Sequence, residues 1–320
     1  EMGPLMFQDD LLAGSPGLTE AMAANMRVAM VMREKRLRLN KDKSVCLVWG
    51  SSKQKKEIMK ELEKNPLKCG EVVMKMTDHD KWLGDYLHTD GLKASMLETI
   101  IQREGKVKGA ALEIAAIVDD WRSHLVGGFV TGFLLWESCC VSSLLHNSGS
   151  WVDLPEQAEK RLESLQLWYL RLLLRQGPGV ASGSLLWETK TLSMKLRIWR
   201  EKLSLALHIV RLKEDSLANR IWKEQKQYGW PGLAAEIKRI TEELGIEDVN
   251  TTELSKSAFR RQVTEACHRL NEQRLREEME GKRKCQKILA DGYGRKEYFN
   301  KIKNQHKSGC TSQQGRICWP

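Results

Sequence analysis

Two adjacent aspartates, Asp9 and Asp10, stand in the middle of the apolar stretch from Pro4 to Ala13. A carboxylate is costly to bury without a partner, because desolvation disfavours its charged form. The pair therefore indicates either a solvated turn or a metal site. Adjacent carboxylates at a hairpin tip provide the hard oxygen ligands that suit Mg²⁺ or Mn²⁺, and paired ions of this kind serve phosphoryl transfer.

Two short apolar runs flank the aspartates and would position them. Leu5–Phe7 and Leu11–Ala13 are separated by polar residues, which is the pattern of two strands joined at a turn. Ser15 followed by Pro16 is a favourable helix start, with the serine as N-cap and the proline at the first helical position. We expect this helix to run to about residue 37.

The remainder of the first ninety residues alternates between strand and helix patterns. Residues 44–50, SVCLVWG, have the β-branched and aromatic content of a strand, and residues 53–63 form a short charged helix. Further strands are expected at 71–77 and 82–88, with Gly84 marking a bend, a bulge or the close approach of another backbone.

From Leu92 onward the apolar residues recur at helical spacing. Turn signals at 147–149, 177–179 and 229–232 separate the expected helices. The apolar stretch 125–145 is long enough to span a membrane, but it contains Glu137 and lacks a one-sided excess of flanking Lys and Arg. We therefore favour a buried helix there and expect no membrane association.

Composition limits the classes of protein that fit. The chain has 320 residues, 41% of them hydrophobic, and a net charge of +10, which favours polyanionic partners such as nucleic acid. Residues 251–307 hold fifteen Lys and Arg against eight Asp and Glu, in what we expect to be a long polar helix. The eight cysteines are irregularly spaced, as in reduced intracellular proteins, which favours the nucleus or the cytoplasm.

Three short segments together resemble one protein family. Phe7-Gln8-Asp9-Asp10 between apolar strands looks like the F-x-D-D box of reverse transcriptases from non-LTR (LINE-type) retrotransposons. Residues 39–44, LNKDKS, are similar to the family's next motif, L-N-x-x-K-[ST]. Residues 81–84, KWLG, resemble the Y-L-G segment of the primer grip, with Trp82 where the family usually has tyrosine. Their order and distances also match the family's.

The resemblance implies an α+β fold. A small antiparallel palm-type sheet with helices would occupy residues 1–90, a mainly helical thumb and connection region 91–250, and a basic helical segment with a loose tail 251–320. It also implies an RNA-directed DNA polymerase, a nucleotidyltransferase that takes an RNA template, a DNA primer and deoxynucleoside triphosphates.

Residue roles follow from the same resemblance. Asp9 would be a ligand of Mg²⁺ or Mn²⁺ and Asp10 its carboxylate neighbour. Lys43 would lie near the incoming triphosphate and neutralise or protonate the departing pyrophosphate, for which a compact ammonium is suited. On its residue type alone, Lys43 is a solvated loop lysine.

The primer would be held by the remaining motif residues. Phe7 and Gln8 would lie beside the primer terminus, and Gln8 stands where many relatives carry alanine. Leu83 and Gly84 would position the primer strand by backbone approach, which glycine permits because it has no Cβ.

These three motifs do not include every part of the family's catalytic centre. Such enzymes use a third carboxylate and nucleotide-binding fingers from segments that precede the F-x-D-D box. We therefore expect this chain alone not to polymerise DNA. The alternative is a non-catalytic nucleic-acid-binding or structural relic of a mobile element.

Other candidate sites are weaker. Cys267-His268 with Cys285, and His306 with Cys310 and Cys318, supply zinc-type ligands without the paired spacing of a zinc knuckle. Three tryptophans could stack on bases. They are Trp199, Trp222 and Trp230. Because each lies in a helical stretch with other apolar residues, we expect it to pack in the core and not to contact bases.

Overall fold

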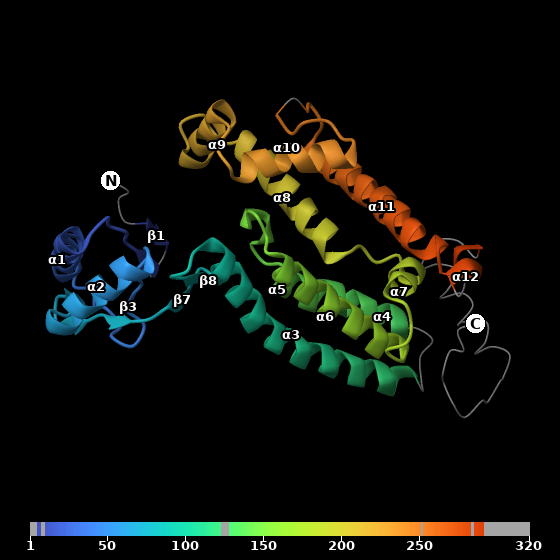
Figure 1. Ribbon diagram of the computed structural model, residues 1–320, viewed down its shortest axis with the longest axis horizontal. Coiled ribbons are helices and arrows are strands. Elements are labelled where there is room, and N and C mark those ends of the chain that lie inside the picture. The colour runs from blue at the N-terminus through green and yellow to red at the C-terminus, as the bar shows by residue number, and fades with distance from the viewer. Residues whose placement is uncertain (1–4, 8–9, 123–127, 251, 283–284, 291–320) are drawn as a thin grey trace. The chain divides into compact units, whose positions relative to one another are not determined.

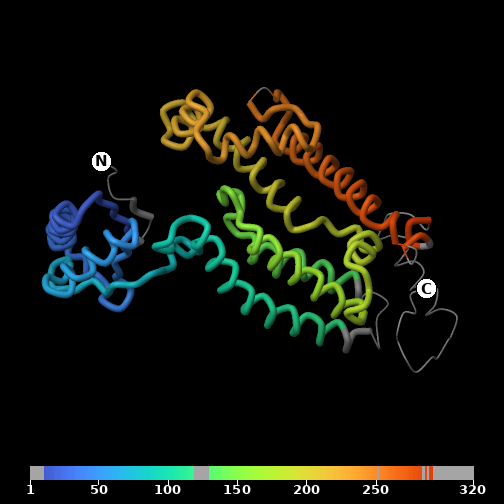
Figure 2. The backbone as a smooth tube through the Cα atoms, viewed as in Figure 1, coloured from blue at the N-terminus to red at the C-terminus, as the bar shows by residue number. Residues whose placement is uncertain are grey.

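A computed structural model describes residues 5–7, 10–122, 128–250, 252–282 and 285–290 (Figure 1). The described chain is mostly helical with a few short strands, which agrees with an α+β fold. It divides into two compact units, Glu1–Thr99 and Ile100–Pro320. The boundary falls within one long helix, α3 (Leu92–Arg122). Figure 2 follows the same backbone as a tube.

The strands lie in the first unit and pair two by two. The expected small antiparallel sheet is divided, in the part that the structure describes, among four two-stranded pairs. Three pairs are antiparallel, and the pair of β3 with β6 is parallel. The strands are β1 (Leu5–Phe7) with β2 (Asp10–Leu12), β3 (Val45–Cys46) with β6 (Lys75–Met76), β4 (Lys68–Cys69) with β5 (Val72–Val73), and β7 (His79–Trp82) with β8 (Asp85–His88).

Two of these pairings revise the sequence interpretation. The strand expected at 82–88 is wrong: residues 79–88 form the β7–β8 hairpin, whose turn lies at Leu83-Gly84. The strand expected at 71–77 is divided into β5 and β6, because β5 pairs with β4 whereas β6 pairs with β3. Short-range alternation cannot distinguish one strand with a bend from two strands and a turn.

Helix α1 (Leu18–Glu34) begins later than the sequence suggested. Its N-cap is Gly17, without a side-chain cap, and the Ser15 hydroxyl donates to the Gly17 carbonyl instead. The prediction of Ser15 as N-cap and Pro16 as first helical residue was therefore wrong. α2 (Ser52–Lys64) has a full capping box, in which Ser51 and Gln54 satisfy each other's backbone amides.

The second unit is helical throughout its described part. After α3, it contains α4 (Gly128–Leu135), a π-helix (Trp136–Val141), α5 (Ser142–Leu144), a 3₁₀ turn (Ser148–Ser150), α6 (Glu156–Leu174), α7 (Ser182–Thr189), α8 (Met194–Val210), α9 (Leu217–Tyr228), α10 (Leu233–Leu244), α11 (Lys256–Glu280) and α12 (Gln286–Ala290). The turn signals at 177–179 and 229–232 lie between two of these helices, and the signal at 147–149 overlaps the 3₁₀ turn between α5 and α6, which confirms those turns.

The apolar segment that follows α3 is part of the core of the second unit. Trp136 and Leu144 are fully buried, and the Trp136 ring stacks on Tyr169 of α6 at 4.2 Å between centroids. The described part of the segment is therefore helical and buried on one face, whereas Val130 and Leu134 of α4 are 45% and 60% exposed. No helix in the described part of the chain is both long enough and apolar enough to cross a membrane.

A second core cluster joins α8, α9, α10 and α11. It contains Trp199 and Trp222, 2% and 4% exposed, so both are core residues as expected. The same expectation is wrong for Trp230, which is 51% exposed. Helix α11 carries six Lys and Arg and five Asp and Glu, so the positive excess of the C-terminal segment does not lie on this helix.

Candidate functional site

The F-x-D-D box lies on an antiparallel hairpin. β1 pairs with β2 so that Phe7 stands opposite Asp10, and two residues in the sequence, Gln8 and Asp9, connect the strands. This confirms the hairpin, and it places the backbone of Asp10 at the start of β2. Gln8, Asp9 and the side chain of Asp10 lie outside the described residues, so the proposed metal pair stays a prediction.

The Lys43 motif forms a compact turn after α1. The Asn40 side chain accepts the amide of Asp42 at 3.0 Å, and its carbonyl accepts the amide of Lys43 at 3.2 Å and the hydroxyl of Ser44 at 2.8 Å. Asparagine commonly organises such turns by accepting a backbone amide two residues ahead. The turn leaves Lys43 exposed, where an anion in solution can reach its ammonium.

A run of cations extends from the last turn of α1 to the turn that contains Lys43. Its C-terminus has the hydrogen bonds of a Schellman motif, with Arg36 at a φ of 55° where glycine is usual. Between residues 33 and 43 there are six cations and two acids, and all six cations are exposed: Arg33, Lys35, Arg36, Arg38, Lys41 and Lys43. We call these six residues the basic run. Sequence reasoning singled out Lys43 and missed its five neighbours, although their spacing is visible in the sequence.

Leu83 and Gly84 form the two-residue turn of the β7–β8 hairpin. Both have positive φ, 49° and 92°, as a tight hairpin turn requires. Glycine tolerates that region freely, whereas a leucine there is uncommon and must be held by its surroundings. The expected bend at Gly84 is therefore a reversal of the chain, and the pair presents its backbone at the tip of a hairpin.

The hairpin is anchored along its second strand, β8. The amides of Tyr86 and His88 donate to the hydroxyls of Thr99 and Ser95 on α3, each at 2.8 Å. The indole of Trp49, shortly after the Lys43 turn and β3, donates to the carbonyl of His88 at 2.9 Å. This hydrogen bond joins the segment that follows β3 to the end of β8 within the first unit.

Metal ligands do not converge elsewhere in the described chain. Among those residues, no three His, Cys, Asp or Glu side chains gather as a metal site requires. The two thiols considered for zinc contact different partners, since Cys267 lies 3.8 Å from the Leu196 carbonyl and Cys285 3.4 Å from the Ser184 hydroxyl. His306, Cys310 and Cys318 lie outside the described residues.

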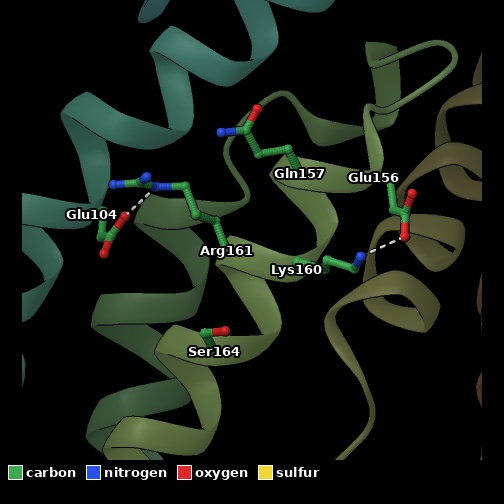
Figure 3. A pocket seen from close by; sticks show the side chains of 6 residues that line it. All are labelled: Glu104, Glu156, Gln157, Lys160, Arg161 and Ser164. Atoms are coloured by element: carbon green, nitrogen blue, oxygen red, sulfur yellow. Dashed lines mark hydrogen bonds and ion pairs between the residues drawn. The ribbon is translucent and has the colours of Figure 1, made fainter.

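A shallow pocket of the second unit is lined by charges that satisfy one another (Figure 3). Arg161 of α6 reaches Glu104 of α3 at 2.7 Å, and Lys160 pairs with Glu156 at 2.6 Å. Partial burial raises the pKa of Glu104, but hydrogen bonds from Lys108 and Arg161 outweigh it and lower that pKa overall. The Arg161–Glu104 pair joins α6 to α3, whereas the Lys160–Glu156 pair lies within α6.

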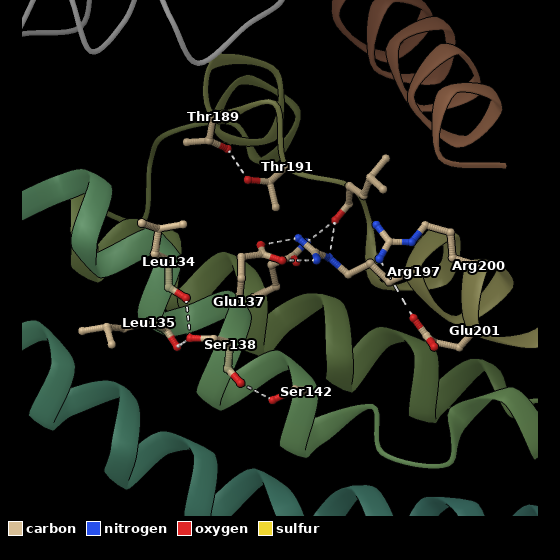
Figure 4. Close-up of polar contacts among 12 residues, drawn as sticks. Leu134, Leu135, Glu137, Ser138, Ser142, Thr189, Thr191, Arg197, Arg200 and Glu201 are labelled. Atoms are coloured by element: carbon tan, nitrogen blue, oxygen red, sulfur yellow. Dashed lines mark hydrogen bonds and ion pairs between the residues drawn. The ribbon is translucent and has the colours of Figure 1, made fainter. Parts of the chain in front are cut away.

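An ion pair between a buried arginine and a half-buried glutamate lies beside the π-helix (Figure 4). Arg197 of α8 contacts Glu137 of the π-helix with two hydrogen bonds of 2.5 and 2.7 Å, and its Nε donates to the Leu192 carbonyl at 3.1 Å. π-Helices often occur at functional sites, because the extra residue redirects side chains. Here the redirected Glu137 serves to fix the start of α8.

A small polar cavity of about 160 Å³ opens between α6, α8 and α10. Lys202, only 1% exposed, pairs with Glu236 at 2.5 Å, and burial lowers the pKa of Lys202 against the opposing effect of that carboxylate. The second oxygen of Glu236 is buried without a hydrogen-bond partner in the described part of the chain. The cavity is polar and large enough for water, which can satisfy such an oxygen.

Comparison with known proteins adds no assignment. No protein-family model, curated protein or solved structure is significantly similar to this chain.

Proposed function

We propose that this chain carries part of the polymerase centre of an RNA-directed DNA polymerase, similar to the reverse transcriptases of non-LTR retrotransposons. The observation that supports this best is the register of β1 with β2, in which Phe7 faces Asp10 and the box spans a hairpin. The proposal agrees with the placement of the other two motifs, one in an exposed turn and one at a hairpin tip.

The reaction joins a nucleotide to a primer. The primer 3′-oxygen bonds to the α-phosphorus of a deoxynucleoside triphosphate, the bond from that phosphorus to the bridging oxygen breaks, and pyrophosphate leaves. Mg²⁺ or Mn²⁺ held by Asp9 and Asp10 would activate the attacking hydroxyl and stabilise the leaving group. Carboxylate oxygens suit these ions, and a third carboxylate must complete the set.

The basic run would take the triphosphate. Lys43 neutralises or protonates the departing pyrophosphate, and the other cations of the run raise the local concentration of the polyanionic substrate. Leu83 and Gly84 would support the primer strand with their exposed backbone turn, since a glycine permits close approach. RNA template and DNA primer are thus the expected macromolecular partners.

Metal binding tests this proposal on the chain alone. Mn²⁺ binding, followed by electron paramagnetic resonance with a deoxynucleoside triphosphate present, should weaken by about 10-fold or more in Asp9→Asn and Asp10→Asn. Asp42→Asn is the matched control, because Asp42 is exposed beside Lys43 but is not assigned a metal. Equal Mn²⁺ affinity in all three variants would contradict the metal assignment.

Primer extension tests the catalytic part. The full chain is mixed with a separately produced polymerase segment that supplies the fingers and the third carboxylate, and Mg²⁺-dependent copying of an RNA template is measured. Extension should fall about 100-fold or more in Asp9→Asn, because the attacking hydroxyl loses its activation. Extension that survives Asp9→Asn unchanged would refute the role of Asp9.

The exposed basic run also supports a second function, that of a nucleic-acid-binding relic without catalysis. Binding would then weaken with salt, because cations that contact phosphates release counterions. It would be indifferent to Mg²⁺ and to Asp9→Asn, which separates it from the first proposal.

A further inference from the structure

Two aromatic rings are stacked on the surface of the second unit. Tyr228 at the end of α9 and Trp230 just after it lie 5.2 Å apart between ring centroids, with 25° between their planes. They are 59% and 51% exposed. A large aromatic ring at a protein surface exposes apolar area to water. Two such rings stacked together are therefore a candidate binding site, because a partner that covers them removes this area from water.

The loop that carries the stack is held in place. Gly229 ends α9 at a φ of 63°, and the amide of Trp230 donates to the Gln225 carbonyl at 3.2 Å. The Gln225 side chain accepts the amide of Ala234, and it lies so close to Gly232 that a Cβ there would approach it to 2.8 Å. The rings are therefore preorganised, which reduces the entropy lost when a partner binds.

Helix α9 presents different residues to the core and to solvent. Trp222 faces the core and donates to Asn250 at 3.0 Å. Leu217, Ile221 and Tyr228 are exposed and recur at helical spacing on the opposite side. The stack thus continues an outward apolar face and does not belong to the packing of the unit.

The positive charge of the whole chain, +10, and the excess of cations on α9 favour a polyanion. α9 carries three cations and one acid, and all four side chains are exposed: Arg220, Lys223, Glu224 and Lys226. Lys223 pairs with Glu214 at 2.9 Å. A partner with flat apolar rings and regularly spaced negative charges would satisfy both the aromatic faces and these cations.

We propose that the Tyr228–Trp230 stack is a platform on which unpaired bases of a single-stranded nucleic acid stack. The outer ring faces extend the existing stack by one base on either side, and every base has such a face, so the site takes strands of any sequence. This site lies in the second unit and does not depend on the metal pair or on Lys43.

Fluorescence anisotropy on the full chain tests the platform. The probes are a labelled oligothymidine strand of about 15 nucleotides and an abasic strand of the same length, which keeps the phosphates but lacks the bases. In Trp230→Ala and Tyr228→Ala, affinity for the oligothymidine should fall about 10-fold, and affinity for the abasic strand by less than about 2-fold. Tyr228→Phe keeps the ring and should bind as the unchanged protein does.

Leu217→Ala is the matched control. It removes an equally exposed apolar side chain from the same helix, about 16 Å along the axis from Tyr228, and should leave both affinities unchanged. The ring variants remove exposed side chains, so thermal melting should confirm that they are folded.

Three results would overturn the platform. The first is no binding of oligothymidine by the unchanged protein, and the second is an equal loss for both strands in Trp230→Ala. The third is displacement of the oligothymidine by an acidic peptide such as polyglutamate at equal charge concentration, which would make the face a site for acidic protein. Loss of Mn²⁺ binding in Asp9→Asn with an intact platform would separate this inference from the proposed polymerase centre.

Discussion

Replacing Glu163 by glutamine should stabilise the protein at neutral and higher pH. Glu163 lies on α6 against the start of α8, where its carboxylate accepts the amide of Lys195 at 3.2 Å. Burial raises its pKa from an ordinary 4.5 to about 7, because the backbone hydrogen bonds from α8 and the charge of Arg197 do not offset desolvation and the repulsion of Glu159. The folded protein therefore holds a proton that the unfolded chain has already released.

The sign and size of the effect follow from that difference. Below about pH 4.5 Glu163 is protonated in both states and has no pH-dependent effect. As the pH rises to about 7 the unfolded chain ionises first, so the free energy of unfolding falls, and above pH 7 the loss is constant. A shift of this size corresponds to at most about 3 kcal/mol, since one pKa unit is about 1.4 kcal/mol.

Denaturant unfolding at about pH 4, 6 and 8 measures this effect. Glu163→Gln should match the unchanged protein at the lowest pH and exceed it by up to about 3 kcal/mol at the highest, or roughly 5–10 °C in Tm. Glu156→Gln is the control, because Glu156 is on the same helix but exposed and paired with Lys160, and should give no gain at high pH. Parallel pH profiles for Glu163→Gln and the unchanged protein would refute the reasoning.

Further perturbations probe the second unit and the tail. Arg197→Leu should cost about 1–3 kcal/mol in chemical denaturation, because it removes two charge-assisted hydrogen bonds from the half-buried Glu137 carboxylate. Gly149→Ala should cost about 1–3 kcal/mol, since a Cβ there would lie 2.9 Å from the Glu201 carbonyl oxygen of α8. Residues 291–320 carry six Lys and Arg and two acids. Their removal should make nucleic-acid binding less dependent on salt. The slope of log affinity against log salt concentration should become shallower by up to about 0.9 for each phosphate that these cations neutralise.

Each of these predictions has an internal control. Adding Glu137→Gln to Arg197→Leu should restore part of the stability, because the half-buried carboxylate that lacks its partner is then gone. A double variant that is no more stable than Arg197→Leu would contradict the ion-pair argument. Gly177→Ala should be close to neutral, since no atom lies within 4 Å of a Cβ there. A salt slope unchanged by the truncation would show that residues 291–320 bind no phosphate.

Local signals predicted the elements that depend on local chemistry. The strands around the F-x-D-D box were predicted because their apolar runs are short and separated by charge, and α2 because its polar start and helical spacing lie together in the sequence. The Ser15 cap failed for the opposite reason, since Gly17 could start α1 equally well and the serine found another acceptor. Capping preferences favour one candidate start over another but do not exclude the alternatives.

Features that depend on tertiary packing could not be predicted in this way. A turn with leucine at positive φ, as at Leu83, contradicts the residue preference and is maintained by the anchoring of β8 on α3. The exposure of Trp230 depends on how α9 and α10 pack. The apolar residues near Trp230 in the sequence do not predict that packing. The pKa of Glu163 likewise reflects the approach of α8, which no residue of α6 specifies.

The positive charge of the chain is concentrated in short segments. This allows phosphate binding by those segments to be distinguished from base stacking on Trp230. Residues 1–99 hold sixteen Lys and Arg against fifteen Asp and Glu, so only the local basic run, not the first unit as a whole, can attract phosphate. Residues 281–307 hold nine against two. Phosphate binding by such cations weakens with salt through counterion release, whereas base stacking on Trp230 does not. Charge variants should therefore change the slope of affinity against salt, and Trp230→Ala should lower affinity by the same factor at every salt concentration.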